Sequence, residues 1–323
     1  MKLLVAGAGA IGQWLGARLQ DAGHQAHLLA RPRFADALRN GLTIDGATTF
    51  HAPVPVATDL EEARKNGPYD LVLLTCKAYD TGRLGAAVAP LLHDDGVLAT
   101  LQNGLGNAQK LGKHVPPGRL AVALTSHGIT VQAPGHLHHA GTGPTLVGAP
   151  DPDAPEAAHR LHDLLKDAEL EPTWTDDLRS AIWYKALVNA AINPVGALHD
   201  KTNGQIHADA DLQALVRHLA QEGASLAKRA RVDLPGDPAE AALTTLQKTA
   251  GNRCSMLQDV QAQRPTEIEQ ITGRMVRLAE QLLVSLPRNE AIYGRIKRLE
   301  ASYLGEEASR QTGWDEIQYT FAV

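Results

Sequence analysis

The chain has 323 residues, a length that suits two domains of ordinary size. Hydrophobic residues make up 44% and charged residues 21%, which suits a globular protein, and with aromatic residues at only 4% the core must be aliphatic. The net charge of -5 gives no electrostatic reason to expect nucleic acid or an anionic membrane as a partner. No apolar run approaches the roughly 20 residues that span a bilayer, and no signal-peptide cleavage site follows the first apolar run.

Cysteine and histidine usage gives no sign of a metal centre. Cys76 and Cys254 lie far apart and match no metal-ligand spacing, so reduced thiols in a cytoplasmic protein are the simplest interpretation. His136, His138 and His139 lie close together, but alternation on a hairpin would separate adjacent histidines, and no carboxylate or cysteine joins them in the sequence. We therefore expect no bound metal.

The first half of the chain alternates short β-like runs with helix-like segments, as βαβ units of a parallel sheet do. The unbroken aliphatic run DLVLLTC is typical of a strand covered on both faces. The segment 127–149 instead has turn residues between short strands, which we interpret as antiparallel hairpins added to the same sheet; a helix over 154–170 follows. The candidate parallel strands are 2–8, 24–30, 70–76, 96–102 and 119–126.

From about residue 178 onward the pattern is helical almost throughout, with turn signals such as NP, NG and LPGDP between helices. We place the domain boundary near 172–178. The polar segment after Leu304 is assigned no role. The strongest helix candidates are 178–192, 208–231, 238–250 and 266–284.

A glycine-rich loop separates the first predicted strand from the first predicted helix. It reads GAGAIG, a G-x-G-x-x-G in the context that gives the pattern meaning. Gly7 allows the tight turn, Gly9 lets the backbone approach a pyrophosphate, and Gly12 lets the helix pack on the strand. The competing interpretation is a tight turn without a ligand. The residues expected to bind the dinucleotide are Gly7, Ala8, Gly9, Ala10, Ile11 and Gly12.

The end of the second strand indicates which dinucleotide is bound. NAD-binding versions usually place an acidic residue there, but this strand leads into Arg31, Pro32 and Arg33 with no carboxylate. A guanidinium suits a 2′-phosphate, so NADP(H) is favoured and Arg31 is the better candidate. A solvated surface arginine is the alternative. We thus predict an α/β fold: an NADP-binding domain with a Rossmann-type doubly wound sheet, residues 1–172, followed by an all-α substrate and catalytic domain, residues 173–323.

Two polar residues follow later strands of the predicted sheet. Lys77 comes after DLVLLTC and Asn103 after GVLATLQ, both at the edge where doubly wound sheets bind ligands. Each alone reads as an ordinary loop residue. As a pair beside a nucleotide-binding loop, they are candidates for the nicotinamide and substrate end of the site.

The stretch WYKALVNAAINPVGAL, residues 183–198, carries Lys185, Asn189 and Asn193 in an otherwise apolar helix. A step of four residues rotates about 40° around a helix, so the three polar groups form one narrow row. An unpaired buried amide costs about 1–3 kcal/mol and a charge more, so the row should face partners or a wet cleft. A structural network is the alternative, with the asparagines capping loops and Lys185 paired to a carboxylate. Asn193-Pro194 is also expected to mark the helix end.

Several stretches together resemble the ketopantoate reductase family (2-dehydropantoate 2-reductases), from the glycine loop to about residue 300. The matching pieces are GAGAIG, the lysine in CKAYDT, LQNGLGN, KALVNAAINPVGAL, NRCSMLQDV and RPTEIEQITG. Cys254 stands where a serine is common, and EQITG replaces the more usual acidic-x-Ile-Asn-Gly. Neither departure falls on a residue expected to act in chemistry.

The resemblance implies a role for each matching residue. Lys185 matches the catalytic lysine that donates a proton to the substrate carbonyl. Glu267 matches an acidic residue that reaches the cofactor; it could also balance Lys185, or simply start a helix. Lys77 and Asn103 match residues at the nicotinamide and substrate end. The residues that match substrate-binding positions are Asn103, Asn189, Asn193, Asn203 and Ser255.

The resulting hypothesis is an enzyme that reduces 2-dehydropantoate to pantoate with NADPH, a step toward pantothenate and coenzyme A. A lysine whose pKa is lowered by burial can donate to the growing alkoxide and then protonate it. The alternatives are a paralogous NADP-dependent reductase of another 2-oxo acid and a non-catalytic NADP-binding sensor. The expected partner is a small 2-oxo acid, and helical second domains of this type often pair, which leaves a homodimer open.

Overall fold

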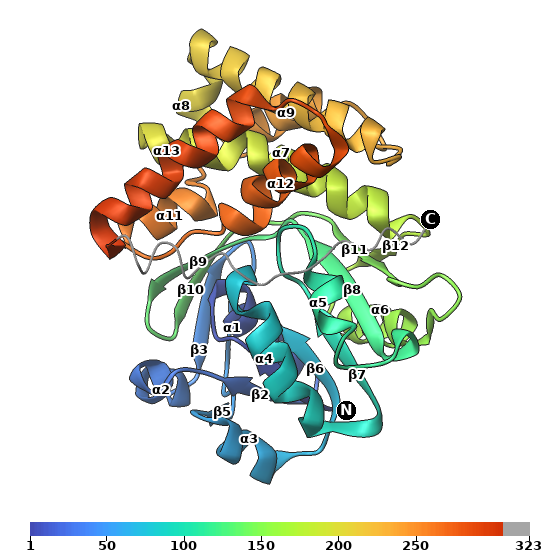
Figure 1. The fold of residues 1–323 in the computed structure, drawn as a ribbon. Coiled ribbons are helices and arrows are strands. Elements are labelled where there is room, and N and C mark those ends of the chain that lie inside the picture. The colour runs from blue at the N-terminus through green and yellow to red at the C-terminus, as the bar shows by residue number, and fades with distance from the viewer. Residues whose placement is uncertain (306–323) are drawn as a thin grey trace. The chain divides into compact units, whose positions relative to one another are not determined.

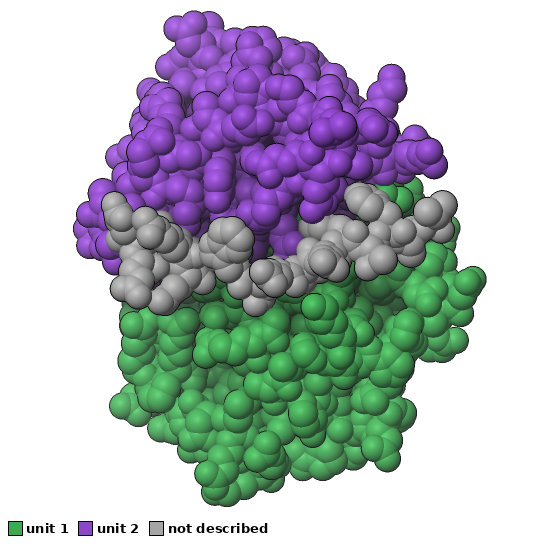
Figure 2. Space-filling view, in the orientation of Figure 1, with its two compact units in different colours: residues 1–181 green, residues 182–323 purple. Residues whose placement is uncertain are grey.

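The computed structural model describes residues 1–305. The polar segment after Leu304, which is assigned no role, lies outside the described residues apart from Gly305. The chain forms two compact units, Met1–Ala181 and Ile182–Val323, drawn in separate colours in Figure 2. The division falls inside helix α7, Leu178–His199, a few residues after the boundary expected near 172–178. In the described part of the chain, no helix is both long and apolar enough to cross a membrane.

The first unit is built on an eight-stranded sheet with the order β12-β11-β8-β7-β6-β1-β2-β5 (Figure 1). All of its neighbouring pairs are parallel except β11 and β8. The order reverses at β1, which confirms the doubly wound α/β fold predicted from the sequence. The strands are β1 Lys2–Ala6, β2 Gln25–Leu29, β5 Val56–Ala57, β6 Tyr69–Leu74, β7 Leu92–Thr100, β8 Leu120–Thr125, β11 Thr145–Gly148 and β12 Pro172–Trp174.

Both faces of this sheet are buried, because side chains along each central strand alternate between two cores. In β1, Leu3 and Val5 enter one core, while Leu4 and Ala6 enter the other. Helices α1 and α6 cover the first face, and α3, α4 and α5 cover the second. The helices of this unit are α1 Ala10–Asp21, α2 Pro32–Arg39, α3 Leu60–Asn66, α4 Thr81–Val88, α5 Asn107–Leu111 and α6 Glu156–Asp167, with short 3-10 turns at Ala78–Asp80, Ala89–Leu91 and Pro117–Arg119.

The hairpin expected to extend the main sheet forms a second sheet instead. Strands β9, Gly128–Ala133, and β10, His136–Gly141, pair with each other, and β10 then pairs in parallel with β3 in the order β4-β3-β10-β9. Only β11 of the segment 127–149 joins the main sheet. Pairing of β10 with β3, Leu42–Gly46, buries Ile44 and Leu137 fully in the core that α1 covers, and this burial stabilises the second sheet. The remaining strand of this sheet is β4, Phe50–Ala52.

The second unit is helical, as predicted. Helices α7, α8, α9, α10 and α13 share one core, and α11, the residues before η4, and α13 share another with the end of α7. The segment 266–284, expected as one helix, contains a π-helical turn, η4, before α12. The elements after α7 are α8 Asn203–His207, α9 Ala210–Arg229, α10 Pro238–Lys248, α11 Ser255–Gln261, η4 Glu269–Gly273, α12 Arg274–Leu282 and α13 Pro287–Leu304.

The prediction that Asn193-Pro194 ends its helix is wrong. Helix α7 continues through Pro194 to His199. A proline removes one backbone hydrogen bond and crowds the preceding turn. Here the residues after it, Val195 and Ala197, are buried in the two cores of the unit, and that burial offsets the lost bond.

A histidine pair lies where the second sheet meets α1. His127 Nδ1 is 3.0 Å from His139 Nε2, and Thr48 Oγ1 is 2.9 Å from His139 Nδ1. The indole ring of Trp14 lies 4.7 Å from the His127 ring. Burial lowers the pKa of His127 to about 4 and lowers that of His139 as well, with Arg18 adding to both shifts. Both histidines are therefore neutral in the folded protein at neutral pH.

This burial makes the stability of the protein depend on pH in a defined window. Unfolded histidines take up protons below about pH 6.5, whereas folded His127 does so only near pH 4. Stability should therefore be complete above pH 6.5 and be lost as the pH falls from there toward 4. We expect the urea midpoint, followed by circular dichroism, to fall less steeply over this window in His127→Gln than in the wild type. The exposed His218→Gln serves as control, and equal slopes for all three proteins would contradict the prediction.

Candidate active site

The carboxyl ends of the central strands lie level with one another. Ala6 of β1 is paired with Leu29 of β2 and with Leu74 of β6, and Leu74 is paired with Thr100 of β7. The loops that follow these strands therefore start along one edge of the sheet, at the point where the strand order reverses around β1. In doubly wound folds this is the edge where ligands bind. The glycine loop, Arg31, Lys77 and Asn103 all come from these loops.

Two of the three glycines in the loop are required by the protein's own backbone. Gly7 has φ +120°, and a Cβ there would lie 2.5 Å from the amide nitrogen of Cys76. A Cβ on Gly12 would overlap the carbonyl oxygen of Gly7. The side chains of Thr75 and Gln13 then hold the loop: Thr75 Oγ1 donates to Gly7 O at 2.7 Å, and Gln13 Nε2 donates to Ala8 O at 2.9 Å.

Gly9 is different, since no atom of residues 1–305 explains why it should be a glycine. The nearest atom to a Cβ built there is the carbonyl oxygen of Thr75, at 3.9 Å. Gly9 also caps α1, and within the described part of the chain no side chain caps the first amides of that helix. Open space in front of unsatisfied helix-terminal amides is what a phosphate requires. The residues of the loop, including Ala8, Ala10 and Ile11, therefore fit the pyrophosphate of a dinucleotide.

Arg31 and Arg33 point to different partners. The Nη2 atom of Arg31 lies 3.8 Å from Asp80 Oδ2, and Arg83 Nη2 lies 2.9 Å from Asp80 Oδ1. Arg33 instead places its guanidinium 4.7 Å from the centre of the Phe34 ring. Arg31 thus inclines toward the loop that follows β6, while remaining about two-thirds exposed. Of the two arginines, Arg31 is the one held near the other strand-end residues.

Lys77 and Asn103 are both partly buried at this edge. Lys77 begins the short turn Ala78–Asp80, where its carbonyl oxygen accepts from the amide of Asp80 at 2.9 Å. The carbonyl oxygen of Asn103 accepts from Asn107 Nδ2 at 2.8 Å. The backbones of both residues are therefore fixed by local hydrogen bonds.

In the second unit, helix α7 carries the polar row with the four-residue spacing. Lys185 and Asn189 are partly buried, and Asn193 is 7% exposed. The surrounding residues Ala186, Leu187 and Ala190 are buried. The row thus runs along a helix that is otherwise packed into the protein.

The ionisation of Lys185 is altered by its surroundings. Burial lowers its pKa to about 8, and the negative charge of Glu267 opposes that shift. Glu267 is itself 7% exposed, in the turn before η4. The coupling favours Glu267 as the balance for Lys185, one of the roles considered for it. A lysine with this pKa is an ammonium in most molecules at neutral pH and gives up its proton readily.

Cys254 joins α11 to α7 and can replace the more common serine. Its Sγ donates to the carbonyl oxygen of Asn193 at 3.4 Å and caps α11 by accepting from Leu257 N at 3.5 Å. Burial raises the pKa of this thiol to about 11, so it keeps the proton that it donates. Ser255 is the next residue, exposed at the start of α11.

Asn203 lies deeper than the other candidates. It is 3% exposed at the start of α8, where its Nδ2 donates to Thr249 Oγ1 at 2.7 Å and its backbone amide donates to Asn252 O at 3.0 Å. These bonds join α8 to the end of α10. Asn203 therefore helps to hold this part of the unit together, in addition to any contact with a substrate.

The sequence did not single out several residues that shape the strand-end edge. Thr75 and Gln13 hold the glycine loop, Asp80 holds Arg31, and Gln102 bonds to the backbone before Lys77. Their positions carried a signal, because each directly follows a predicted strand or lies within three residues of a predicted site residue. What the sequence lacked was the direction of each side chain.

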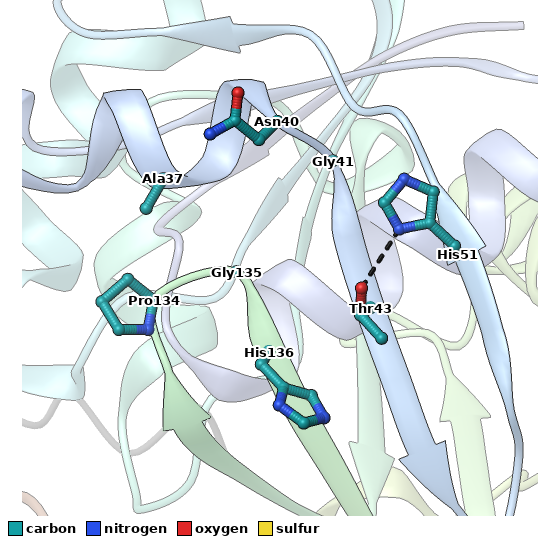
Figure 3. A pocket seen from close by; sticks show the side chains of 8 residues that line it. All are labelled: Ala37, Asn40, Gly41, Thr43, His51, Pro134, Gly135 and His136. Atoms are coloured by element: carbon teal, nitrogen blue, oxygen red, sulfur yellow. Dashed lines mark hydrogen bonds between the residues drawn. The ribbon is translucent and has the colours of Figure 1, made fainter.

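Outside this edge, the first unit has an open pocket lined by residues of α2, β3, β4 and the β9–β10 turn. Figure 3 shows Thr43 Oγ1 bonded to His51 Nδ1, 3.1 Å apart, beside His136. None of the predicted site residues lines it. Asp45 bridges His136 and His138, at 2.7 and 2.5 Å. Among the described residues, no group of three or more histidine, cysteine or acidic side chains is arranged to hold a metal ion.

Comparison with known proteins gives consistent matches over nearly the whole chain. The model of the family described as Ketopantoate reductase PanE/ApbA matches residues 3–152, and the model of its C-terminal part matches residues 177–300. A 2-dehydropantoate 2-reductase of Archaeoglobus fulgidus is 32% identical over 93% of this chain and 98% of its own length. The enzyme of the same name from Vibrio cholerae is 30% identical over 94% and 99%.

Solved structures show the same fold. A PanE/ApbA family ketopantoate reductase from Ralstonia eutropha matches with a TM-score of 0.85 and 26% identity, covering 94% of this chain and all of that one. A D-mandelate dehydrogenase, solved with NADH and anilino(oxo)acetate, matches with a TM-score of 0.86 over 94% and 99%. At 22% identity the second similarity indicates the fold alone.

The charge on Lys185 can be tested without any assumption about the reaction. We expect the Lys185 Nζ resonance, followed by NMR and assigned by its loss in Lys185→Met, to titrate near pH 8. Glu267→Gln removes the charge that stabilises the ammonium, so the pKa should fall further in that variant. A wild-type titration near the ordinary lysine value, or an unchanged pKa in Glu267→Gln, would contradict this description of the row.

Proposed function

The chain belongs to the ketopantoate reductase family, and on that premise we propose that it reduces 2-dehydropantoate to pantoate with NADPH, with Lys185 as proton donor. The chain is accordingly an oxidoreductase that uses a nicotinamide cofactor. Pantoate production is a step toward pantothenate and coenzyme A in this proposal. The observation that carries it is the row of Lys185, Asn189 and Asn193 along an otherwise apolar helix, where burial lowers the pKa of Lys185 to about 8.

NADP(H) is proposed over NAD(H) because of the charge at the end of β2. The position that often holds a carboxylate in NAD-binding folds is followed here by Arg31, whose guanidinium inclines toward Asp80. A 2′-phosphate would compete with the Asp80 carboxylate for Arg31 and would be the stronger partner, since it carries more charge and more acceptor oxygens. Arg83, which also contacts Asp80, would add positive charge nearby.

The proposed reaction adds a hydride to a ketone carbon and a proton to its oxygen. When bound, the nicotinamide supplies the hydride. Lys185 donates a hydrogen bond to the ketone oxygen, transfers its proton as negative charge grows there, and is left as a neutral amine. Its pKa of about 8 suits the role, because an ordinary lysine would hold the proton far more tightly.

The neighbouring side chains are proposed to orient the substrate. Asn189 and Asn193 offer amide groups to hydroxyl and carbonyl oxygens without adding charge, and the hydroxyl of Ser255 can donate to the substrate carboxylate. Asn203 is proposed to support the substrate site by holding α8 to the end of α10 through its bond to Thr249. Glu267 keeps Lys185 protonated at the start of each cycle by raising its pKa against the effect of burial.

Removal of the Lys185 amine should slow turnover severely and spare cofactor binding. We expect Lys185→Ala to lower kcat by about 10²- to 10⁴-fold, the usual contribution of a positioned proton donor. The Kd for NADPH, measured by the change in its fluorescence, should stay within about twofold, since the proposed role of this side chain concerns the substrate. The exposed Lys228→Ala is the matched control. Near-normal turnover of 2-dehydropantoate by Lys185→Ala would reject the mechanism.

The cofactor preference rests on one guanidinium. Arg31→Ala should raise the KM for NADPH by about 10- to 100-fold, as expected for the loss of a charge-assisted hydrogen bond, and leave the KM for NADH nearly unchanged. Arg33→Ala, whose side chain contacts Phe34, should change neither value. If the wild-type protein prefers NADH, or if Arg31→Ala weakens both cofactors equally, the assignment of NADP(H) is wrong.

A further inference from the structure

Four buried polar side chains connect the loops that carry Lys77 and Asn103. Thr81 is 0% exposed, Thr100 1%, Asn107 6% and Gln102 7%. They come from the start of α4, the end of β7, the start of α5 and the loop after β7. Buried polar groups are costly unless they are bonded to one another, so a cluster of this kind fixes the backbone around it.

Gln102 lies at the centre of the cluster and uses both ends of its amide. Its Nε2 donates to the carbonyl oxygen of Cys76 at 2.9 Å and to Cys76 Sγ at 3.3 Å. Its Oε1 accepts from Thr100 Oγ1 at 2.9 Å and lies 3.1 Å from Thr81 Oγ1. Gln102 therefore connects the backbone before Lys77 to the end of strand β7.

The cluster extends from Gln102 to Asn103 by a second route. Thr81 Oγ1 lies 3.0 Å from Asn107 Oδ1 and 2.9 Å from the carbonyl oxygen of Ala78, so with Gln102 Oε1 its single hydrogen has three acceptors within reach. Asn107 Nδ2 then donates to the carbonyl oxygen of Asn103 at 2.8 Å. The loops after β6 and β7 are thus joined through three buried side chains, those of Gln102, Thr81 and Asn107.

The same hydrogen bonds also bear on the glycine loop. The backbone of Cys76 packs directly on Gly7, where a Cβ would lie 2.5 Å from the Cys76 nitrogen. The residue whose carbonyl group is held by Gln102 therefore contacts the glycine loop and is followed directly by Lys77. A shift of the Cys76 backbone would therefore move Lys77 and, at the same time, disturb the glycine loop.

We propose that Gln102 is a positioning residue, which sets Lys77 and Asn103 in register with the glycine loop so that the cofactor is bound in a reactive position. The inference rests on the proposed function, since Lys77 and Asn103 are proposed to line the nicotinamide and substrate end. Gln102 itself need not touch the cofactor. Its amide is required because one end must donate and the other must accept.

Two substitutions break the cluster at different points. Gln102→Met keeps the length of the side chain and removes both ends of the amide. Thr81→Val keeps the shape of the side chain and removes the hydroxyl between Gln102 and Asn107, while Thr81→Ser retains that hydroxyl. The control is Tyr69→Phe, because Tyr69 is also fully buried and its hydroxyl donates to Ala63 O at 2.8 Å from the opposite, amino end of β6.

For each variant the Kd for NADPH alone, kcat and KM with 2-dehydropantoate, and the urea midpoint are measured. We expect Gln102→Met to raise the Kd for NADPH about tenfold and to lower kcat by about 10- to 100-fold, the effect of displacing reactive groups by about 1 Å. Thr81→Val should change both in the same direction, and Thr81→Ser should restore them to within about twofold of the wild type. Tyr69→Phe should lower only the urea midpoint.

The proposal is overturned if Gln102→Met and Thr81→Val lower the urea midpoint as Tyr69→Phe does and leave Kd and kcat unchanged. It is also overturned if Tyr69→Phe changes Kd and kcat as much as they do. If Gln102→Met does not fold, the comparison of Thr81→Val with Thr81→Ser decides. Should the wild type bind NADPH without reducing 2-dehydropantoate, the proposed function fails, while the ratio of NADPH Kd values still tests the positioning role.

Discussion

The parallel register of β2, β1, β6 and β7 decides where every candidate residue of the first unit lies. Ala6 is paired with Leu74, and Leu74 is paired with Thr100. The strands therefore end at one level, and the loops after them begin side by side. A shift of β6 by two residues would displace Lys77 relative to the glycine loop by about 6.6 Å, given the rise of about 3.3 Å per residue in a strand. The apolar alternation that fills both cores fixes this register.

The second unit depends on a different balance, between burial and charge. Helix α7 is held by apolar packing on most of its surface, and the same packing makes the ammonium of Lys185 less stable than it would be in water. Glu267 offsets part of that cost. The result is a lysine poised between its charged and neutral forms near neutral pH, which is a useful state for proton transfer and a poor one for stability alone.

Much of this organisation could be predicted from the sequence, and the exceptions have physical causes. The βαβ rhythm, the glycine loop and the row Lys185, Asn189 and Asn193 follow from local spacing. Local spacing determines which residues share a helix face or a strand end in the folded protein. The path of α7 through Pro194 was missed because burial of residues further along the chain outweighed a local rule. The second sheet was missed because β3 and β10 are about ninety residues apart, and no local pattern pairs them.

The candidate site shows the same division. Residues whose chemistry stands out by type and position, such as Arg31 or Lys77, could be selected from the sequence. Gln102 could not be distinguished from any polar residue after a strand, because its importance lies in the directed hydrogen bonds that both ends of its amide make. Asn203 was selected for contact with substrate, yet the structure also gives its amide a bond to Thr249, a partner forty-six residues away.

The most direct measurement of the central claim is the pH dependence of kcat for NADPH oxidation with 2-dehydropantoate as substrate. A proton donor must be protonated, so kcat should be constant below about pH 8 and fall above it by a factor approaching ten per pH unit, following the lowered pKa of Lys185. A rate that stays constant up to pH 10, in a protein still folded at that pH, would contradict the assignment of Lys185 as the donor.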